Sequence, residues 1–302
     1  MKRLGRYRLV RVLGSGAFAT VWLGEDPDLE TEVAVKVLAD NWATNADVRE
    51  RFLAEARLLR RVDDPRVVRV FDIGVSEDDR PFFVMEHVRG GTLADRMGGL
   101  STGESLAYGA ATARALHVLH EAGVVHRDVK PSNLLVDDRT TPPRLVVSDL
   151  GSAKVLAEAS GLTVTTGTPL YMAPEQVHQS DGFDARADVY AVAAVTYHLL
   201  AGRPAFGDTS PAAVLARRAG TRPAPLAASL GQPAALDRLM LRALSWDPSK
   251  RPATAAQLAN ELERLADDQP ASVRREVSPL LVLVICVGLF LSLFTITYFA
   301  LR

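Results

Sequence analysis

The chain has 302 residues, 48% of them hydrophobic, which is enough for a substantial core and excludes a wholly disordered protein. Its 35 lysines and arginines nearly balance its 36 aspartates and glutamates. The overall charge therefore gives no indication of a nucleic-acid-binding protein, and no such partner is expected. The single cysteine, Cys286, cannot form an internal disulfide, which fits a reducing compartment.

The first part of the chain is rich in strand-like segments. Short apolar, β-branched runs lie between turn-forming residues at 7–13, 20–24, 32–38, 67–74 and 81–86. One amphipathic helix interrupts them at 48–62, with Phe52, Ala56 and Leu59 at helical spacing and arginines on its other side. We expect a small, strand-rich N-terminal lobe and hinge over residues 1–88.

After two consecutive glycines, Gly90 and Gly91, the pattern changes to helices. Helical periodicity is found at 103–122, 186–200, 236–244 and 254–266. We expect residues 89–266 to form a second, mainly helical lobe. Together the two lobes predict an α+β protein.

The C-terminal end predicts a membrane anchor. Residues 267–278 form a short linker with charges and prolines, and 279–301 is an uncharged apolar run of about 34 Å as a helix, enough to cross a bilayer. A buried core helix is the alternative, but such helices rarely run this long without a charge. Arg274 and Arg275 precede the run and only Arg302 follows it. We therefore expect a single-pass cell-membrane protein with a cytoplasmic main part and almost no extracellular tail.

A glycine-rich segment near the N-terminus is the first candidate functional feature. Residues 14–21 read Gly-Ser-Gly-Ala-Phe-Ala-Thr-Val, and glycines let a backbone approach phosphate closely. A plain glycine hairpin explains this segment equally well. The next apolar strand carries Lys36, and an inward lysine needs anionic partners. A phosphate and Glu55, on the amphipathic helix, are the expected partners, although a solvated lysine and a surface glutamate remain the alternative.

The most specific string is 126–133, His-Arg-Asp-Val-Lys-Pro-Ser-Asn, followed by an apolar strand. A second short strand at 145–147 places Asp149 in the loop that follows. The oxygens of Asn133 and Asp149 suit hard cations such as Mg²⁺ or Mn²⁺ that bridge ATP phosphates.

At these residues the sequence resembles the eukaryotic-type protein kinases, and most closely their bacterial, Hanks-type serine/threonine branch, over about residues 7 to 265. The resemblance implies the two-lobed kinase fold with ATP in the cleft. It also implies that 167–175 docks protein substrates, that Asp188 supports the catalytic loop and that Arg251 pairs with Glu175. The nucleotide-binding residues implied by it are Leu13, Gly14, Ser15, Gly16, Ala17, Val21, Ala34, Lys36, Met85, Glu86 and Val88.

The resemblance and the chemistry together assign the catalytic roles. Asp128 is expected to accept the proton of the substrate hydroxyl, and Lys130 to neutralise charge on the transferred phosphoryl group. Lys36, positioned by Glu55, is expected to hold the α- and β-phosphates. Lys130, two residues after Asp128, follows the pattern of serine/threonine kinases, so the expected activity is ATP-dependent phosphorylation of serine or threonine in proteins.

Two positions depart from the family pattern. Ala19 replaces the third glycine of the loop, and Leu150 replaces the usual phenylalanine after the metal-binding aspartate. Neither change removes a catalytic group, so we expect at most an altered rate or nucleotide affinity.

The segment between Asp149 and Glu175 predicts regulation by autophosphorylation. Thr163, Thr165 and Thr166 lie there, and a phosphate on any of them would pair with Arg127. Ordinary turn chemistry is the alternative for each threonine. A membrane tether would favour trans-phosphorylation within a homodimer by raising the local concentration.

Two other functions agree less well with these residues than a protein kinase does. A silent pseudokinase scaffold is disfavoured because no catalytic residue is missing. A small-molecule kinase of similar fold is disfavoured by the protein-docking segment that ends at Glu175.

Overall fold

The computed structural model describes residues 3–150, 169–177, 184–207 and 216–268. Met1–Ala266 forms one compact unit and Asp267–Arg302 a second. The predicted membrane helix 279–301, most of the linker before it and the threonines at 163, 165 and 166 lie outside the described residues. Within the described part of the chain, no helix combines the length and hydropathy required to span a bilayer.

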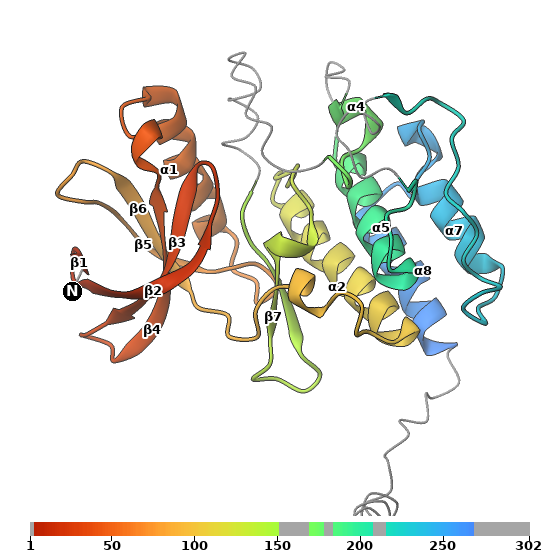
Figure 1. The fold of residues 1–302 in the computed structure, drawn as a ribbon, viewed down its shortest axis with the longest axis horizontal. Helices are drawn as coiled ribbons and strands as arrows, with labels where there is room; N and C mark the ends of the chain where they lie inside the picture. Colours follow the sequence, from red (N-terminus) through yellow and green to blue (C-terminus); the bar gives the residue numbers. More distant parts are fainter. Residues whose placement is uncertain (1–2, 151–168, 178–183, 208–215, 269–302) are drawn as a thin grey trace, which may run out of the picture. The chain divides into compact units, whose positions relative to one another are not determined.

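The N-terminal lobe is built on one antiparallel sheet (Figure 1). The six strands run in the order β1-β2-β3-β4-β6-β5. Their bounds are β1 Arg3–Leu4, β2 Tyr7–Ser15, β3 Ala19–Asp26, β4 Thr31–Leu38, β5 Val70–Val75 and β6 Pro81–Glu86. The five predicted strands are confirmed as β2 to β6, each within a few residues at its ends.

Helix α1, Ala46–Arg61, covers one face of this sheet. The side chain of Asn45 accepts a hydrogen bond from the Val48 amide at 3.1 Å and so caps the first turn. The predicted apolar face is confirmed, because Phe52 and Leu59 are buried and Phe52 packs against Phe83 of β6 with ring centroids 5.0 Å apart. A 3₁₀ turn, η1 Asp40–Trp42, precedes the helix.

The opposite face of the sheet has a small core of its own. Its members are Leu4, Tyr7, Leu9, Val33, Val35, Val37, Phe82 and Val84, with Trp22 packed against them. Alternation along β4 explains both cores, since Val33, Val35 and Val37 face this cluster whereas Ala34 and Lys36 face the other side.

One predicted strand begins later than its sequence pattern indicated. Val67 and Val68 are apolar enough for a strand, but they precede β5, which starts at Val70, and are not part of the sheet. Val67 forms a bridge with Val147 of the C-terminal lobe, and the Val68 amide donates to the Val147 carbonyl at 2.9 Å. Their hydrophobicity therefore serves the contact between the lobes.

The C-terminal lobe is mainly helical, as predicted. The helices of its described part are α2 Thr102–Glu121, α4 Pro174–Val177, α5 Arg186–Ala201, α7 Ala235–Ala243 and α8 Ala255–Asp267, with 3₁₀ turns η2 Leu93–Arg96, η3 Pro131–Asn133 and η4 Pro248–Lys250. Helix α5 is buried along almost its whole length and packs against α2. It ends at Gly202, whose φ of 65° is a conformation that favours glycine.

A two-stranded hairpin lies between the sheet and the helices (Figure 1). Strand β7, Leu134–Asp137, pairs with β8, Arg144–Val147. The candidate catalytic residues Asp128 to Asn133 come directly before β7, and Asp149 comes directly after β8. The hairpin therefore brings Asp149 close to the residues that precede β7, at the boundary between the lobes.

Candidate active site

The glycine-rich loop is shorter than its sequence indicated. Strand β2 continues through Gly14, which pairs with Val21 of β3 after an irregularity in register. The Gly16 amide donates to the Ala19 carbonyl at 2.9 Å and closes a tight turn. The turn between β2 and β3 therefore comprises only residues 16–18.

Lys36 stands at the centre of a charged cluster. Its Nζ atom lies 2.7 Å from Oε1 of Glu55 on α1 and 2.7 Å from Oδ1 of Asp149 after β8. The side chain of Lys36 is 12% exposed and that of Glu55 only 2%. The predicted ion pair with Glu55 is therefore present, and the structure adds Asp149 as a second partner.

The two carboxylates keep Lys36 charged. Burial favours the neutral amine, but the charges of Asp149 and Glu55 outweigh burial and raise the pKa of Lys36 above its ordinary value. Burial likewise opposes ionisation of Asp149, yet Lys36, with smaller contributions from His126 and Lys130, lowers the pKa of Asp149. An ammonium ion and a carboxylate thus face the space between the lobes at neutral pH.

The segment before β7 gathers the other predicted catalytic groups. Oδ2 of Asp128 accepts a hydrogen bond from Nζ of Lys130 at 2.7 Å. The side-chain nitrogen Nδ2 of Asn133 donates to the backbone carbonyl of Asp128 at 2.8 Å and to Oδ2 of Asp128 at 3.1 Å. These contacts fix the direction of the Asp128 carboxylate, which is the group expected to meet the substrate hydroxyl.

Asp188 of α5 binds the backbone of the catalytic segment, as the resemblance implied. Its carboxylate accepts hydrogen bonds from the amides of His126 at 2.8 Å and Arg127 at 2.9 Å. Arg127 has a φ of 70°, a left-handed conformation that costs a non-glycine residue about 1–2 kcal/mol. Asp188 holds that conformation in place.

His120, which the sequence pattern does not predict as a functional residue, also binds Asp188. The imidazole Nε2 of His120 on α2 lies 2.8 Å from Oδ2 of Asp188, and the side chains of His120 and Asp188 are 9% and 1% exposed. A histidine at the end of a helix carries no signal of this kind, because its partner lies 68 residues further along the chain.

The metal-binding prediction is chemically consistent with the structure. The side-chain nitrogen of Asn133 donates to Asp128, so the side-chain oxygen of Asn133 is the atom that would bind a cation. Asp149 offers a carboxylate nearby. No group of three or more potential metal-ligating side chains occurs in the described residues.

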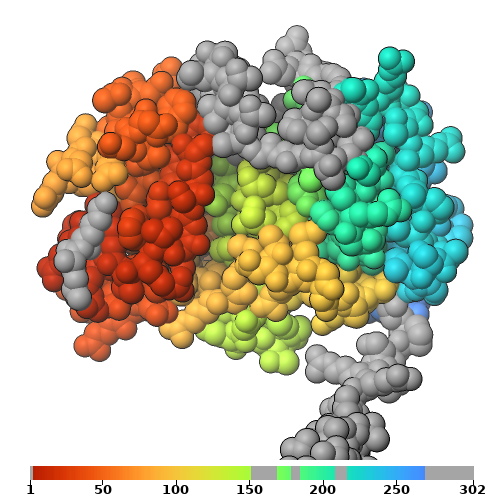
Figure 2. All heavy atoms as spheres, viewed as in Figure 1, coloured from red at the N-terminus to blue at the C-terminus, as the bar shows by residue number. Residues whose placement is uncertain are grey.

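The predicted adenine-binding residues lie on β4, β6 and the hinge. Ala34 pairs with Met85 across the sheet, and both are buried, as is Val88. The Glu86 amide already donates to the Arg69 carbonyl at 2.9 Å, so only its carbonyl remains for a nucleotide. In the space-filling view, atoms of the catalytic segment (yellow-green) are visible between the red N-terminal lobe and the yellow and green C-terminal lobe (Figure 2).

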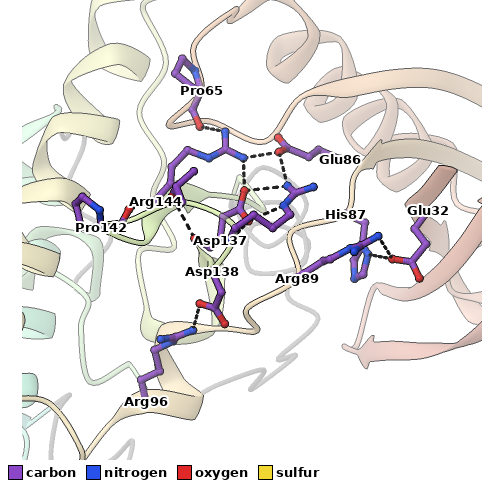
Figure 3. A network of polar contacts seen from close by, with 12 residues as sticks. Glu32, Pro65, Glu86, His87, Arg89, Arg96, Asp137, Asp138, Pro142 and Arg144 are labelled. Carbon is purple, nitrogen blue, oxygen red and sulfur yellow. Dashed lines mark hydrogen bonds and ion pairs between the residues drawn. The ribbon is translucent and has the colours of Figure 1, made fainter.

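A network of charges ties the back of the hinge to the β7–β8 hairpin (Figure 3). The guanidinium of Arg144 on β8 donates to Glu86 of the hinge, to Asp137 of β7 at 2.9 Å and to the Pro65 carbonyl at 2.6 Å. Arg139 binds Asp137 through two nitrogens at 2.8 Å. One arginine thus connects the N-terminal lobe, the hinge and the C-terminal lobe.

The predicted pairing of Arg251 with Glu175 is confirmed. Two guanidinium nitrogens of Arg251 bind the two carboxylate oxygens of Glu175 at 2.6 and 2.8 Å. Arg251 is buried, and it also donates to the carbonyl of Arg186 at 3.0 Å. The end of the predicted substrate-docking segment is therefore fixed to the helical core.

Comparisons with known proteins agree with this site. The family described as "Protein kinase domain" matches residues 7–262. "Serine/threonine-protein kinase pkn2" of Myxococcus xanthus is 37% identical over 85% of this chain and 32% of its own length. "DNA damage-responsive serine/threonine-protein kinase RqkA" of Deinococcus radiodurans is 40% identical over 85% of this chain and 39% of its own.

Further relatives include a solved structure. "Serine/threonine-protein kinase PknB" of Mycobacterium tuberculosis is 34% identical over 88% of this chain and 44% of its own length. The crystal structure of the M. tuberculosis PknI kinase domain has a TM-score of 0.68 and 30% identity, and covers 88% of this chain and 98% of that one. The chain spans less than half the length of these curated relatives.

The chain therefore belongs to the protein kinase family. Its relatives place it in the bacterial, Hanks-type serine/threonine branch. The expected two-lobed kinase fold is confirmed.

Proposed function

We propose that this chain is an active serine/threonine protein kinase that transfers the γ-phosphoryl group of ATP to protein hydroxyls. The observation that carries the proposal is the position of Lys36, 2.7 Å from both Glu55 and Asp149. In this arrangement the helix α1, the sheet and the loop after β8 are all in place around one lysine. Phosphoryl transfer in protein kinases requires this lysine–glutamate pair and the metal-binding aspartate to be in place together.

Each of the residues at this site has its own role in the proposed phosphoryl transfer. Lys36 binds and orients the α- and β-phosphates, and Glu55 holds it in position. A bound Mg²⁺ would supply charge neutralisation at the β- and γ-phosphates, with Asn133 and Asp149 as its protein ligands. Asp128 orients the substrate hydroxyl and accepts its proton as the oxygen attacks.

Lys130 defines the proposed acceptor. Its ammonium group lies 2.7 Å from Asp128, so it can also reach a phosphoryl group that is in line with the attacking oxygen. A lysine at this position follows the serine/threonine pattern of the family, and the curated relatives carry that activity in their names.

The test is transfer of labelled phosphate from Mg-ATP to a generic basic protein, followed by identification of the labelled residues. We expect labelled serine and threonine and no labelled tyrosine. Lys36→Met should reduce transfer at least about 100-fold, because the phosphates lose their main cation. Labelled tyrosine would refute the assignment of the acceptor, and absence of transfer by the wild type would favour the pseudokinase.

We also propose that residues 279–301 anchor the chain in the cell membrane with the kinase on the cytoplasmic side. The proposal is supported by the length and lack of charge of this run and by Arg274 and Arg275 before it. In fractionated cells the full chain should sediment with membranes and resist carbonate extraction. The variant Val287→Arg/Leu291→Arg should become extractable; recovery of the wild type in the soluble fraction would contradict the anchor.

Autophosphorylation at Thr163, Thr165 or Thr166, in trans within a homodimer, is a further part of the proposed signalling role. Arg127 is exposed next to Asp128 and could receive such a phosphate. Mass spectrometry after incubation with Mg-ATP should find phosphate between residues 152 and 168. Active kinase mixed with an Asp128→Asn chain should phosphorylate the inactive copy, whereas an unmodified inactive copy would contradict transfer in trans.

A further inference from the structure

The tip of the glycine-rich loop is bonded to the segment that connects β4 with α1. The carbonyl of Ala17 accepts a hydrogen bond from the indole Nε1 of Trp42 at 2.9 Å. The carbonyl of Phe18 accepts one from the amide of Ala39 at 2.8 Å. Both carbonyls at the tip are therefore held by the same connecting segment.

An aromatic contact reinforces these bonds. The rings of Phe18 and Trp42 are stacked with centroids 5.2 Å apart and planes inclined by 29°. Both side chains are partly buried and pack against the main hydrophobic core. An aromatic pair and a hydrogen bond each typically change a conformational equilibrium by a few-fold to about tenfold, so Trp42 can determine which loop conformation predominates.

Trp42 is itself firmly placed. Its amide donates to the Ala39 carbonyl, and its own carbonyl accepts from the Asn45 amide, both at 3.0 Å. Asn45 caps α1, and a guanidinium nitrogen of Arg49 in the first turns of this helix binds the Ala43 carbonyl at 2.8 Å. The indole thus projects from a segment that is anchored to the helix that carries Glu55.

The direction of these two hydrogen bonds determines where the backbone amides at the tip of the loop point. In a planar trans peptide the carbonyl and the amide point in opposite directions. Because the carbonyls of Ala17 and Phe18 point toward the connecting segment, the amides of Phe18 and Ala19 point away from it. Amides arranged in this way are the groups with which a loop binds phosphate.

We propose that Trp42 is a positioning residue for the phosphates of ATP, a role that rests on the proposed kinase function. Its indole ring and N–H group hold the glycine-rich loop in the conformation that presents its amides to the nucleotide. A cation such as Lys36 attracts the phosphates, whereas Trp42 sets the geometry of the loop that covers them.

Nucleotide binding to two Trp42 variants of the full chain tests this proposal. Trp42→Phe keeps an aromatic ring but removes the donor, and Trp42→Leu removes both contacts. Dissociation constants are measured for Mg-ATP and for adenosine, which has no phosphates. We expect the constant for Mg-ATP to rise about 3-fold in the first variant and about 10-fold in the second. For adenosine it should change less than about 2-fold.

Trp22→Phe is the matched control, because Trp22 lies on the same sheet but packs on the opposite face. It should leave both dissociation constants unchanged. Steady-state kinetics should show a raised KM for ATP in the Trp42 variants with kcat within about 2-fold. An equal loss of affinity for ATP and adenosine, or no loss for ATP, would overturn the proposal.

The same measurements separate this proposal from the proposed function. A wild type that binds Mg-ATP more tightly than its Trp42 variants but transfers no phosphate supports the role of Trp42 and refutes the kinase activity. If the wild type transfers phosphate and the Trp42 variants bind Mg-ATP as tightly as the wild type does, the kinase activity is supported and the role of Trp42 is refuted. A wild type that binds no Mg-ATP refutes both.

Discussion

Arg127 and Asp149 both have left-handed backbone conformations, with φ of 70° and 57°. Such conformations are costly for non-glycine residues and persist where the surroundings hold them. Asp188 binds the Arg127 amide, and Lys36 binds the Asp149 carboxylate. This strain is therefore located at Asp149, which is expected to bind the metal ion, and directly before Asp128, which is expected to accept the proton.

His120 should affect turnover through Asp188 without touching substrate. Replacing His120 with alanine removes one hydrogen bond from a buried carboxylate, which should loosen its hold on the Arg127 amide. We expect kcat to fall about 10-fold with KM for ATP within about 2-fold. His117→Ala, on an exposed part of the same helix, is the control.

A different split between the kinetic constants would point to another role for His120. An unchanged kcat in His120→Ala would show that Asp188 holds the catalytic segment by itself. Recovery of kcat in His120→Gln, which can still donate a hydrogen bond, would support positioning.

Helices α2 and α5 approach each other closely at Gly109. A Cβ atom at this position would lie 2.3 Å from Oγ1 of Thr196. Alanine is the better helix former by about 1 kcal/mol, but overpacking in a core costs about 1–3 kcal/mol. We expect Gly109→Ala to lower the free energy of unfolding by up to about 2 kcal/mol, measured by urea denaturation.

The double variant Gly109→Ala/Thr196→Ala identifies the cause. Removing the Thr196 hydroxyl relieves the clash, so the double variant should be more stable than Gly109→Ala alone, although Thr196→Ala loses a bond to the Val192 carbonyl. Additive losses in the two single variants would show that the clash does not limit stability.

The positions of most elements could be predicted from the sequence because their periodicity is strong. Helix α1 alternates buried Phe52 and Leu59 with exposed arginines, and β4 alternates between two cores. Residues 67–69 could not be assigned correctly, because apolar residues that pair with Val147 look like any strand. Local pattern does not reveal a partner about 80 residues away.

In the candidate site, too, local pattern predicts some residues, whereas others depend on partners that are distant in the sequence. Lys36, Glu55, Asp128, Asn133 and Asp149 are all predicted from residue type, spacing and resemblance, and the structure brings them together. His120 and Trp42 were not predicted, because their importance comes from contacts that only the folded chain creates.

At the scale of the whole molecule, the lobes are joined by a charged network at the hinge. Asp137 is buried and binds Arg139 and Arg144 (Figure 3). The hydrogen bond to Arg139 and, to a smaller extent, that to Arg144 lower the pKa of Asp137 below its ordinary value. A carboxyl with a lowered folded-state pKa stabilises the fold above its unfolded pKa of about 4 and loses this effect as the pH falls through the folded pKa.

Asp137→Asn should therefore be less stable than the wild type by about 1–3 kcal/mol at pH 7. The difference should persist down to about pH 5 and shrink as the pH falls below about 4, because the carboxyl of Asp137 binds a proton at a higher pH in the unfolded state than in the folded state. Urea denaturation at a series of pH values measures it. A difference that grows on acidification would contradict the sign of the pKa shift.

The most direct test of the account compares the wild type with Asp128→Asn in phosphate transfer from Mg-ATP to a basic protein. Asparagine keeps the size of the side chain but cannot accept the proton of the hydroxyl. We predict that the wild type labels serine and threonine and that Asp128→Asn is at least about 100-fold slower while its dissociation constant for Mg-ATP stays within a few-fold. Equal labelling by the two proteins would contradict the assignment of this site.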